Sequence, residues 1–516
     1  MHFLVEKAMV SNCVITACKS SAQGGAVAGI YDKPPKGVCI DCLFHGNNYT
    51  ANKGMVGYLT TFKNCVFSNN VTAVAANGNY VGSVTQSCRN YDCLFIYNQA
   101  EGCGGARGGV SVNCRFLFNS GLNPAGNNWA NPGGGAARDA VLTNCYFYGN
   151  VAYRLGGAIR GGKVVGCTVE SNTVAYASDS HGGGIYGATL VESSTIVSNL
   201  VTKRGGGLAN CSGVTNCYIA FNAAYGTSTT QGGGLSACGT ITNCVVEYNM
   251  CKTGEGGGGM YDTGAHGSIF RFNGGEHFTK DSAACSFTDC EFVGSCLRGP
   301  ELMDRCRMHH MSNQVDLVDN VKYGPCRRSF SYAIVNARTI RNCLFDHAWI
   351  TNGANNAIFY AGGAIPMRVE NCSFVSNVTY MTLRGYSASD RTAAFVNCLM
   401  TGNRRGNTIY DVTGYQSSYT VFTNCWIGYK DIAQNAAMTN SALNIMGRTW
   451  KPRFTGDADH PCSPKLRAPY VGKGLVMDWM SDATDLRGNP RLRDGLVDVG
   501  AYQCWLNPDA TTIILR

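Results

Sequence analysis

Charged residues are scarce in this sequence: Asp, Glu, Lys and Arg make up 15% of the 516 residues, against about a quarter in an average soluble domain. No stretch approaches the roughly 18 consecutive apolar residues that a membrane-spanning helix needs. Dense basic runs, zinc-finger spacings and RNA-binding signatures are missing as well. We therefore expect no membrane span in this chain and no nucleic-acid partner. The net charge of +9 is spread over the whole chain and favours anionic partners only weakly.

Metal and nucleotide motifs are also absent. Cys39-Ile40-Asp41-Cys42 has no second cysteine pair at the spacing of a zinc site. The phosphate-binding pattern Gly-x-x-x-x-Gly-Lys-Ser/Thr does not occur either. We expect neither a metal nor a cofactor.

The sequence is rich in glycine and cysteine, and it is built from a recurring unit. The chain has 65 Gly and 27 Cys. A unit of about 26 residues recurs, made of Asn/Asp-Cys-x-Phe-x-x-Asn, a variable stretch, and Gly-Gly-Gly/Ala with an aliphatic residue. Clear copies of the two halves begin at Asn64, Asn113, Asn144 and Asn371 and at Gly156, Gly182, Gly205 and Gly232.

This unit predicts short strands. In Cys-x-Phe the two apolar residues are two positions apart and share one face of a strand, whereas no helical apolar stripe survives across the glycines. A unit of this size cannot bury its apolar face alone, so successive units must stack. We predict an all-β, single-stranded parallel β-helix of roughly sixteen coils between Cys13 and Cys425.

Stacking explains the recurring Asn and Cys. An Asn at a fixed corner bonds the next Asn along the stack through its side-chain amide, and an inward Cys fills the core as a small hydrophobe. Stacked Cβ atoms lie near ~4.8 Å, wider than the ~3.8 Å that a disulfide prefers. Bridges around a corner stay open as alternatives for the pairs Cys88/Cys93, Cys285/Cys290 and Cys290/Cys296. We expect buried, reduced thiols at Cys65, Cys145, Cys217, Cys244, Cys372, Cys398 and Cys425.

Two sets of motifs carry a family resemblance. The Phe-x-x-Asn and Gly-Gly-Ala-Ile pairs resemble the repeats of chlamydial polymorphic outer-membrane proteins, which are β-helical adhesins. The Asp-Leu-x-Gly-Asn-Pro-Arg segment at 485–491 and the Val-Asp-x-Gly-Ala-Tyr segment at 497–502 are similar to the ending of right-handed parallel β-helix repeat proteins of bacterial surfaces. The resemblance implies a right-handed coil, an extracellular or cell-surface location and a structural or adhesive role.

The repeats define the expected organisation. Residues 1–430 should form the parallel β-helix, with an inserted loop region at 297–335, where the rhythm breaks and charge rises. Residues 431–516 lose the Asn-Cys unit and should form an irregular C-terminal cap segment. Ser11 to Ile15 already reads as a repeat and no secretory signal is visible. We expect a piece of a longer chain, or a homo-oligomer or filament joined through the coil ends.

The variable stretch between the two halves of the unit absorbs the length variation, which places its loops along one face. Aromatic rings beside cations suit glycan binding, because a sugar stacks on the ring and acidic groups pair with the charge. We predict a glycan-binding strip of Tyr153, Arg154, Tyr176, His181, Lys203, Arg204 and Tyr225.

An enzyme is the rival interpretation, because many parallel β-helices cleave polysaccharides. A lyase or glycosidase needs a base or paired carboxylates, but residues 1–260 hold few, scattered acids. Of the polygalacturonase signatures only a fragment occurs, at Ser180-His181-Gly182-Gly183. The sequence favours a non-catalytic structural or adhesive protein that binds acidic glycans; the alternative is a polysaccharide lyase or glycoside hydrolase acting on an acidic polysaccharide.

Overall fold

The computed structural model describes residues 8–20, 25–28, 37–49, 55–72, 82–100, 102–121, 133–175, 179–226, 230–252, 256–274, 285–311, 318–320, 324–326, 332–335, 337–350, 357–361, 366–379, 381–385, 393–409, 414–415, 420–428, 445–446 and 453–504. They belong to two compact units. Unit 1 is Met1–Thr263, Asn273–Phe278 and Val318–Cys326; unit 2 is Gly264–Phe272, Thr279–Leu317 and Arg327–Arg516.

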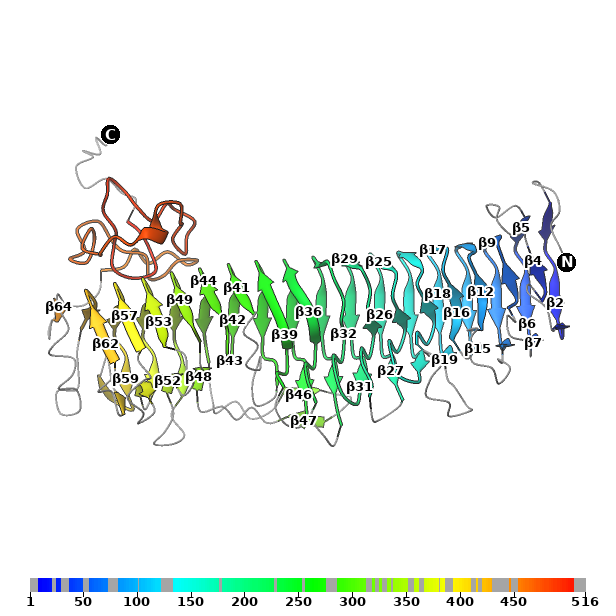
Figure 1. Ribbon diagram of the computed structural model, residues 1–516, viewed down its shortest axis with the longest axis horizontal. Helices are drawn as coiled ribbons and strands as arrows, with labels where there is room; N and C mark the ends of the chain where they lie inside the picture. Colours follow the sequence, from blue (N-terminus) through cyan, green and yellow to red (C-terminus); the bar gives the residue numbers. More distant parts are fainter. Residues whose placement is uncertain are drawn as a thin grey trace. The chain divides into compact units, whose positions relative to one another are not determined.

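Unit 1 is a parallel β-solenoid whose coils each place short strands on three faces (Figure 1). The strands used below from the first face are β8 (Gly57–Tyr58), β12 (Ser83–Gln86), β13 (Arg89–Tyr91), β16 (Cys103–Arg107), β20 (Ala137–Arg138), β24 (Ile159–Arg160), β28 (Ile185–Tyr186), β32 (Leu208–Ala209) and β36 (Leu235–Thr242). The second face has β2 (Val14–Thr16), β6 (Leu43–His45), β10 (Val66–Ser68), β14 (Leu94–Ile96), β18 (Arg115–Leu117), β22 (Tyr146–Tyr148), β26 (Thr168–Glu170), β30 (Thr195–Val197), β34 (Tyr218–Ala220) and β37 (Val245–Glu247). The third face is a ten-stranded sheet of β3 (Lys19–Ser20), β7 (Asn48–Tyr49), β11 (Val71–Thr72), β15 (Gln99–Ala100), β19 (Ser120–Gly121), β23 (Val151–Ala152), β27 (Thr173–Val174), β31 (Leu200–Val201), β35 (Ala223–Ala224) and β38 (Met250–Cys251).

The inward Phe of each repeat builds the core of unit 1. Phe67, Phe95, Phe116 and Phe147 are fully buried on successive coils. Their rings stack with centroids 4.6–4.7 Å apart and planes within 8° of parallel. The prediction that Cys and Phe share the inner face is confirmed.

A ladder of asparagines closes one corner of unit 1. The side-chain Oδ1 of Asn172 accepts from both the backbone N and the Nδ2 of Asn150, each at 2.9 Å. Asn172 repeats this pattern on Asn199 at 3.0 Å. The predicted amide ladder is confirmed, and its members are Asn47, Asn70, Asn98, Asn119, Asn150, Asn172, Asn199, Asn222, Asn249 and Asn273.

The cysteines are thiols. None of the 26 cysteines whose side chains the structure describes forms a disulfide, and these include the seven predicted to be buried and reduced. The alternative bridges Cys88/Cys93, Cys285/Cys290 and Cys290/Cys296 are wrong, since the backbone already holds these residues at stacked inward positions. Burial raises the pKa of Cys88 to about 12, so this thiol stays protonated and unreactive.

Unit 2 is built from coils of the same kind as those of unit 1. On its second face lie β40 (Ile269–Arg271), β42 (Glu291–Val293), β45 (Arg307–His309), β50 (Leu344–Asp346), β54 (Ser373–Val375), β58 (Leu399–Thr401) and β63 (Trp426–Ile427). Inside the predicted insertion at 297–335, β43 (Leu297–Arg298), β44 (Leu302–Asp304), β45 and β48 (Tyr332–Val335) pair with neighbouring coils. The antiparallel pair β46 (Val318–Asn320) and β47 (Gly324–Cys326) lies in the same stretch of sequence but belongs to unit 1.

Residues 453–504 pack on the side of the coils of unit 2. This C-terminal segment holds few regular elements, among them the short 3-10 helix η3 (Asp478–Met480). Its backbone carbonyls accept hydrogen bonds from corner asparagines, as Lys473 O does from Asn424 Nδ2 at 2.7 Å and Leu475 O from Asn397 Nδ2 at 2.7 Å. Tyr502 and Tyr470 pack on outward apolar side chains of the coils, Leu344, Val375, Leu399 and Trp426.

The ending motif holds this C-terminal segment together. Asp485, fully buried, accepts backbone hydrogen bonds from Arg487, Asn489 and Gln503 at 2.7–2.9 Å. The buried Arg491 guanidinium donates to the carbonyls of Asp498 and Gly500. The motif residues are therefore structural.

The predicted fold class, an all-β parallel β-solenoid, is confirmed. The right-handed sense, the total of sixteen coils and the division of the chain at residue 430 stay predictions. Among the described residues, no helix is long and apolar enough to cross a membrane.

Candidate functional site

The variable loops of unit 1 follow the strands of its third face. Strands β23, β27, β31, β35 and β38 pair in parallel register. Tyr225 N donates to Val201 O at 2.8 Å and Lys252 N to Ala224 O at 3.0 Å, which continues the register by one residue. Equivalent positions on successive coils are therefore held by Tyr153, Ala175, Thr202, Tyr225 and Lys252.

A second column of residues runs beside the first. Isolated parallel bridges join Gly133, Leu155, His181, Arg204, Gln231 and Gly256 in coil order. His181 and Arg204 are thus direct neighbours on adjacent coils. Arg154 precedes Leu155 and Lys203 precedes Arg204 in the chain, so their cations lie at the same corner.

One carboxylate ties part of this corner together. Asp179 Oδ1 lies 2.9 Å from His181 Nε2, and Asp179 Oδ2 pairs with Arg154 Nη2. The hydrogen bond from His181 and the contact with Arg154 lower the pKa of Asp179, so it stays ionised. Burial lowers the pKa of His181 below its ordinary value of 6.5, which leaves the ring neutral at pH 7.

The tyrosines are less closely gathered. Tyr225 is 38% exposed, and Lys252 Nζ lies 3.8 Å from its ring centroid. Tyr153 occupies the same position three coils away, about 14 Å along the stack. Tyr176 lies outside the described residues. The sequence prediction missed Lys252, although its spacing of one repeat from Tyr225 could have revealed it.

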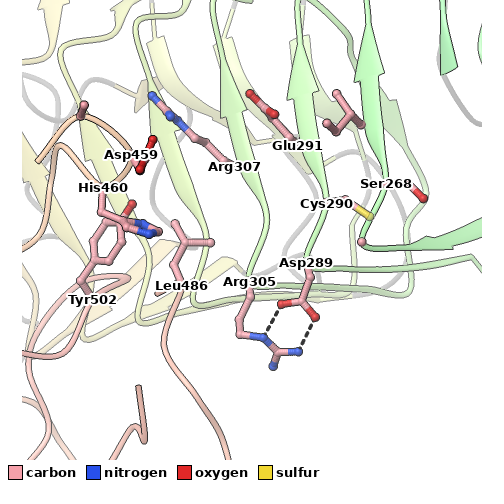
Figure 2. Close-up of a pocket in the computed structure, with 13 residues that line it drawn as sticks. Ser268, Asp289, Cys290, Glu291, Arg305, Arg307, Asp459, His460, Leu486 and Tyr502 are labelled. Atoms are coloured by element: carbon pink, nitrogen blue, oxygen red, sulfur yellow. Dashed lines mark hydrogen bonds and ion pairs between the residues drawn. The ribbon is translucent and has the colours of Figure 1, made fainter. Parts of the chain in front are cut away.

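Unit 2 holds a separate, charged pocket of about 500 Å³ (Figure 2). The coils contribute Asp289, Glu291, Arg305 and Arg307, and the C-terminal segment contributes His460 with other residues. No sequence signal pointed to this pocket, because its walls come from coils and a segment more than 150 residues apart.

The charges in this pocket are largely paired. Arg305 Nε and Nη2 bind Asp289 at 2.6 and 2.8 Å, and Arg307 binds the buried Asp346 at 2.9 and 3.2 Å. Glu291 accepts from His309 at 2.7 Å, which lowers its pKa and keeps it ionised. Glu291 is therefore unsuited to donate a proton. The Tyr502 hydroxyl is buried with no hydrogen-bond partner among the described residues.

Comparisons with known proteins add little to this geometry. No family model and no curated protein matches the chain. Among solved structures, the alginate lyase AlyF-OU02 in complex with G6 is similar at 11% identity and TM-score 0.24, over 87% of this chain and 90% of that one. The tailspike protein of E. coli bacteriophage HK620 with a hexasaccharide is similar at 10% identity and TM-score 0.20, over 85% and 71%. Likenesses at these TM-scores carry no conclusion about what this chain does.

Proposed function

We propose that the chain is a structural or adhesive β-solenoid of the cell surface or extracellular space that binds acidic glycans through unit 1. Its binding site is the corner strip, defined as Tyr153, Arg154, His181, Lys203, Arg204, Tyr225 and Lys252. The observation that carries the proposal is the register of Leu155, His181 and Arg204 on successive coils, which brings Arg154, His181 and the Lys203–Arg204 pair to one corner.

The corner strip offers what an acidic glycan needs. Exposed Arg204 supplies a planar donor for carboxylate or sulfate, and the half-exposed Tyr225 ring supplies a stacking surface. Each contact is weak because the charges are near water. Binding therefore depends on several coils acting together on one polymer.

The test is glycan binding by the intact chain. Binding of polygalacturonate, dextran sulfate and neutral dextran would be measured at several salt concentrations. We expect the two acidic polymers to bind, with affinity falling as salt rises, and dextran not to bind. Arg154→Ala with Arg204→Ala should weaken binding roughly tenfold and leave thermal stability nearly unchanged.

The matched control removes the same charge elsewhere in unit 1. Arg89 in β13 and Arg115 in β18 are exposed and lie on other strands. The variant Arg89→Ala with Arg115→Ala should bind like the parent chain. Equal binding by both double variants would overturn the corner strip, and no binding of any acidic glycan would overturn the proposed function.

A polysaccharide lyase or glycoside hydrolase is the second candidate, because the pocket of unit 2 is concave and lined by three carboxylates, two guanidiniums and His460. The paired state of Glu291, Arg305 and Arg307 weighs against it. Incubation with uronate-containing glycans distinguishes an enzyme from a binding protein. Unsaturated products or new reducing ends that form with the parent chain and not with Glu291→Gln would establish catalysis.

We also propose end-to-end association of the solenoids. In β2 the outward Val14 is 68% exposed, and β2 pairs with β6 among the described strands. An unpaired strand edge recruits another strand. Light scattering should show concentration-dependent assembly, whereas a monomer at all concentrations would contradict it.

A further inference from the structure

Three arginines stand in one column on the first face of unit 1. Arg107 in β16 pairs in register with Arg138 in β20, which pairs with Arg160 in β24. The preceding residues Ala106, Ala137 and Ile159 are fully buried. The arginines therefore lie on the outward face, and the column continues into Gln86 on one side and Tyr186 on the other.

The column concentrates positive charge, which Asp139 offsets in part. Register places the three residues at the strand spacing of ~4.8 Å, where like charges repel. The Arg138 side chain is only 11% exposed and has Asp139 Oδ2 3.2 Å from its Nε. Burial and the neighbouring Arg138 lower the pKa of Arg160, so the charged guanidinium is less stable here than in water. An anionic ligand would relieve this repulsion.

The column borders the corner strip. A Cβ on Gly133 would lie 2.3 Å from Arg160 Cδ, so the Arg160 side chain runs over this glycine. Gly133 bridges to Leu155, and Leu155 bridges to His181. The His181 ring lies 6.0 Å from the ring of Tyr186, the next member of the column. The arginine column and the corner strip thus form neighbouring parts of one surface.

We propose that Arg107, Arg138 and Arg160 bind the acidic groups of a linear polyanionic glycan, bearing uronate or sulfate, that lies along the stacked coils. The inference rests on the proposed function and specifies its ligand. A guanidinium recurring once per coil matches a polymer with regularly recurring acids better than a single small anion. The sequence carries the same rhythm, because each Arg follows the glycine half of its repeat.

The first experiment removes the column. Arg107→Gln, Arg138→Gln and Arg160→Gln together should weaken binding of polygalacturonate and dextran sulfate roughly tenfold or more and flatten its salt dependence. The melting temperature should stay equal or rise, because like-charge repulsion is removed. The control Lys63→Gln, Arg89→Gln and Arg115→Gln removes three exposed cations from other columns and should leave affinity unchanged.

A second variant tests the column at constant charge. Gly133→Ala places a methyl group where Arg160 now lies, with Leu155 O a further 3.1 Å contact. The Arg160 side chain must move, so affinity for both acidic polymers should fall severalfold. Unchanged affinity in Gly133→Ala and in the triple variant would overturn the column.

The outcomes separate this inference from the proposed function. If the parent chain binds and Arg154→Ala with Arg204→Ala weakens binding while the triple variant does not, the column is wrong and the proposed function stands. If poly-L-glutamate binds as tightly as polygalacturonate and the triple variant loses both, the column binds polyanions and the glycan function is wrong. If no polyanion binds the parent chain, both are wrong.

Discussion

The corner just before the inward Cys of the repeat is exposed at Asn144 in unit 1, whereas the C-terminal segment covers it at Asn397 in unit 2. The residue before the inward Cys has a left-handed backbone in both units, with φ of 51° at Asn144 and 53° at Asn397. Asn144 is exposed, whereas Asn397 is fully buried under the C-terminal segment. The coil backbone is thus the same, and the outcome depends on what lies beside it.

The residue after the inward Cys supplies part of the packing under the cover in unit 2. In unit 1 this outward position holds Arg115 or Tyr146 on some coils and an apolar residue on others, such as Val14, Leu43, Val66 and Leu94. In unit 2 it holds Leu344 and Leu399, which pack on Tyr502 and Tyr470 of the C-terminal segment. The C-terminal segment therefore buries apolar outward residues in unit 2, whereas Val14, at the same position in unit 1, is 68% exposed. The cover, and not the outward residue alone, makes the difference.

The largest expected effect breaks the covered corner. Arg491→Met leaves the buried carboxylates of Asp485 and Asp498 without their buried cation, at a cost of about 3–5 kcal/mol. Denaturant titration and limited proteolysis should show release of residues 453–504 while unit 1 stays resistant. Arg487→Met, at a partly exposed ion pair with Asp457, should cost less than about 1 kcal/mol. Equal resistance of both variants to protease would refute this account of the motif.

The next prediction compares the two units by making the same substitution before the inward Cys in each. Asn144→Ala and Asn397→Ala both place alanine in the left-handed region, at about 1 kcal/mol. Asn397→Ala also removes two hydrogen bonds to Leu475, each 2.7 Å, so its total cost should reach about 3 kcal/mol. Denaturation midpoints measure both. Equal losses of unfolding free energy would mean that the C-terminal segment does not stabilise the corner that it covers.

A smaller loss is expected where cysteine becomes serine in the core. Ser194 already occupies a cysteine position, where its Oγ donates to Glu192 O at 2.8 Å and accepts from Cys167 N at 3.0 Å. Cys145→Ser can make the same bonds, so it should cost no more than about 1 kcal/mol. A loss of several kcal/mol in thermal or denaturant unfolding would show that thiol packing matters more than this pattern suggests.

The smallest effect is a pH dependence at the corner strip of unit 1. Because the pKa of His181 is lowered, its stabilising contribution is present above its unfolded pKa near 6.5 and is lost as pH falls through that range. Protonation then adds charge beside Arg204. Dextran sulfate should bind severalfold tighter at pH 5 than at pH 7, by titration calorimetry. His181→Gln should abolish this difference, and a pH effect that persists there would assign it to another group.

The sequence predicted the parts of this protein that depend on periodicity. The Cys-x-Phe spacing predicted the inner face, and the recurring Asn predicted an amide ladder. The continuous ladder runs through the Asn that ends Phe-x-x-Asn, as at Asn150 and Asn172, a position that the sequence had not singled out. It also placed Arg154, His181 and Arg204 at one corner, because equal spacing becomes equal position in a solenoid.

Contacts without a period could not be predicted. Arg305 stands where most coils have Asn or Asp, so its bidentate pair with Asp289 carries no sequence signature. The cover over Asn397 joins residues 78 positions apart through backbone groups of an irregular segment. Such contacts depend on side-chain packing between distant segments and not on the repeat.

Hydrogen–deuterium exchange with an acidic oligosaccharide tests the central claim most directly. Oligogalacturonate would be added to the intact chain, and exchange compared with that of the free chain across both units. We expect added protection at the loops after β23, β27, β31, β35 and β38 of unit 1, around Arg154, His181 and Arg204. Protection confined to residues 267–272, 285–307 and 453–504 of unit 2 would contradict the account and place the ligand in the charged pocket.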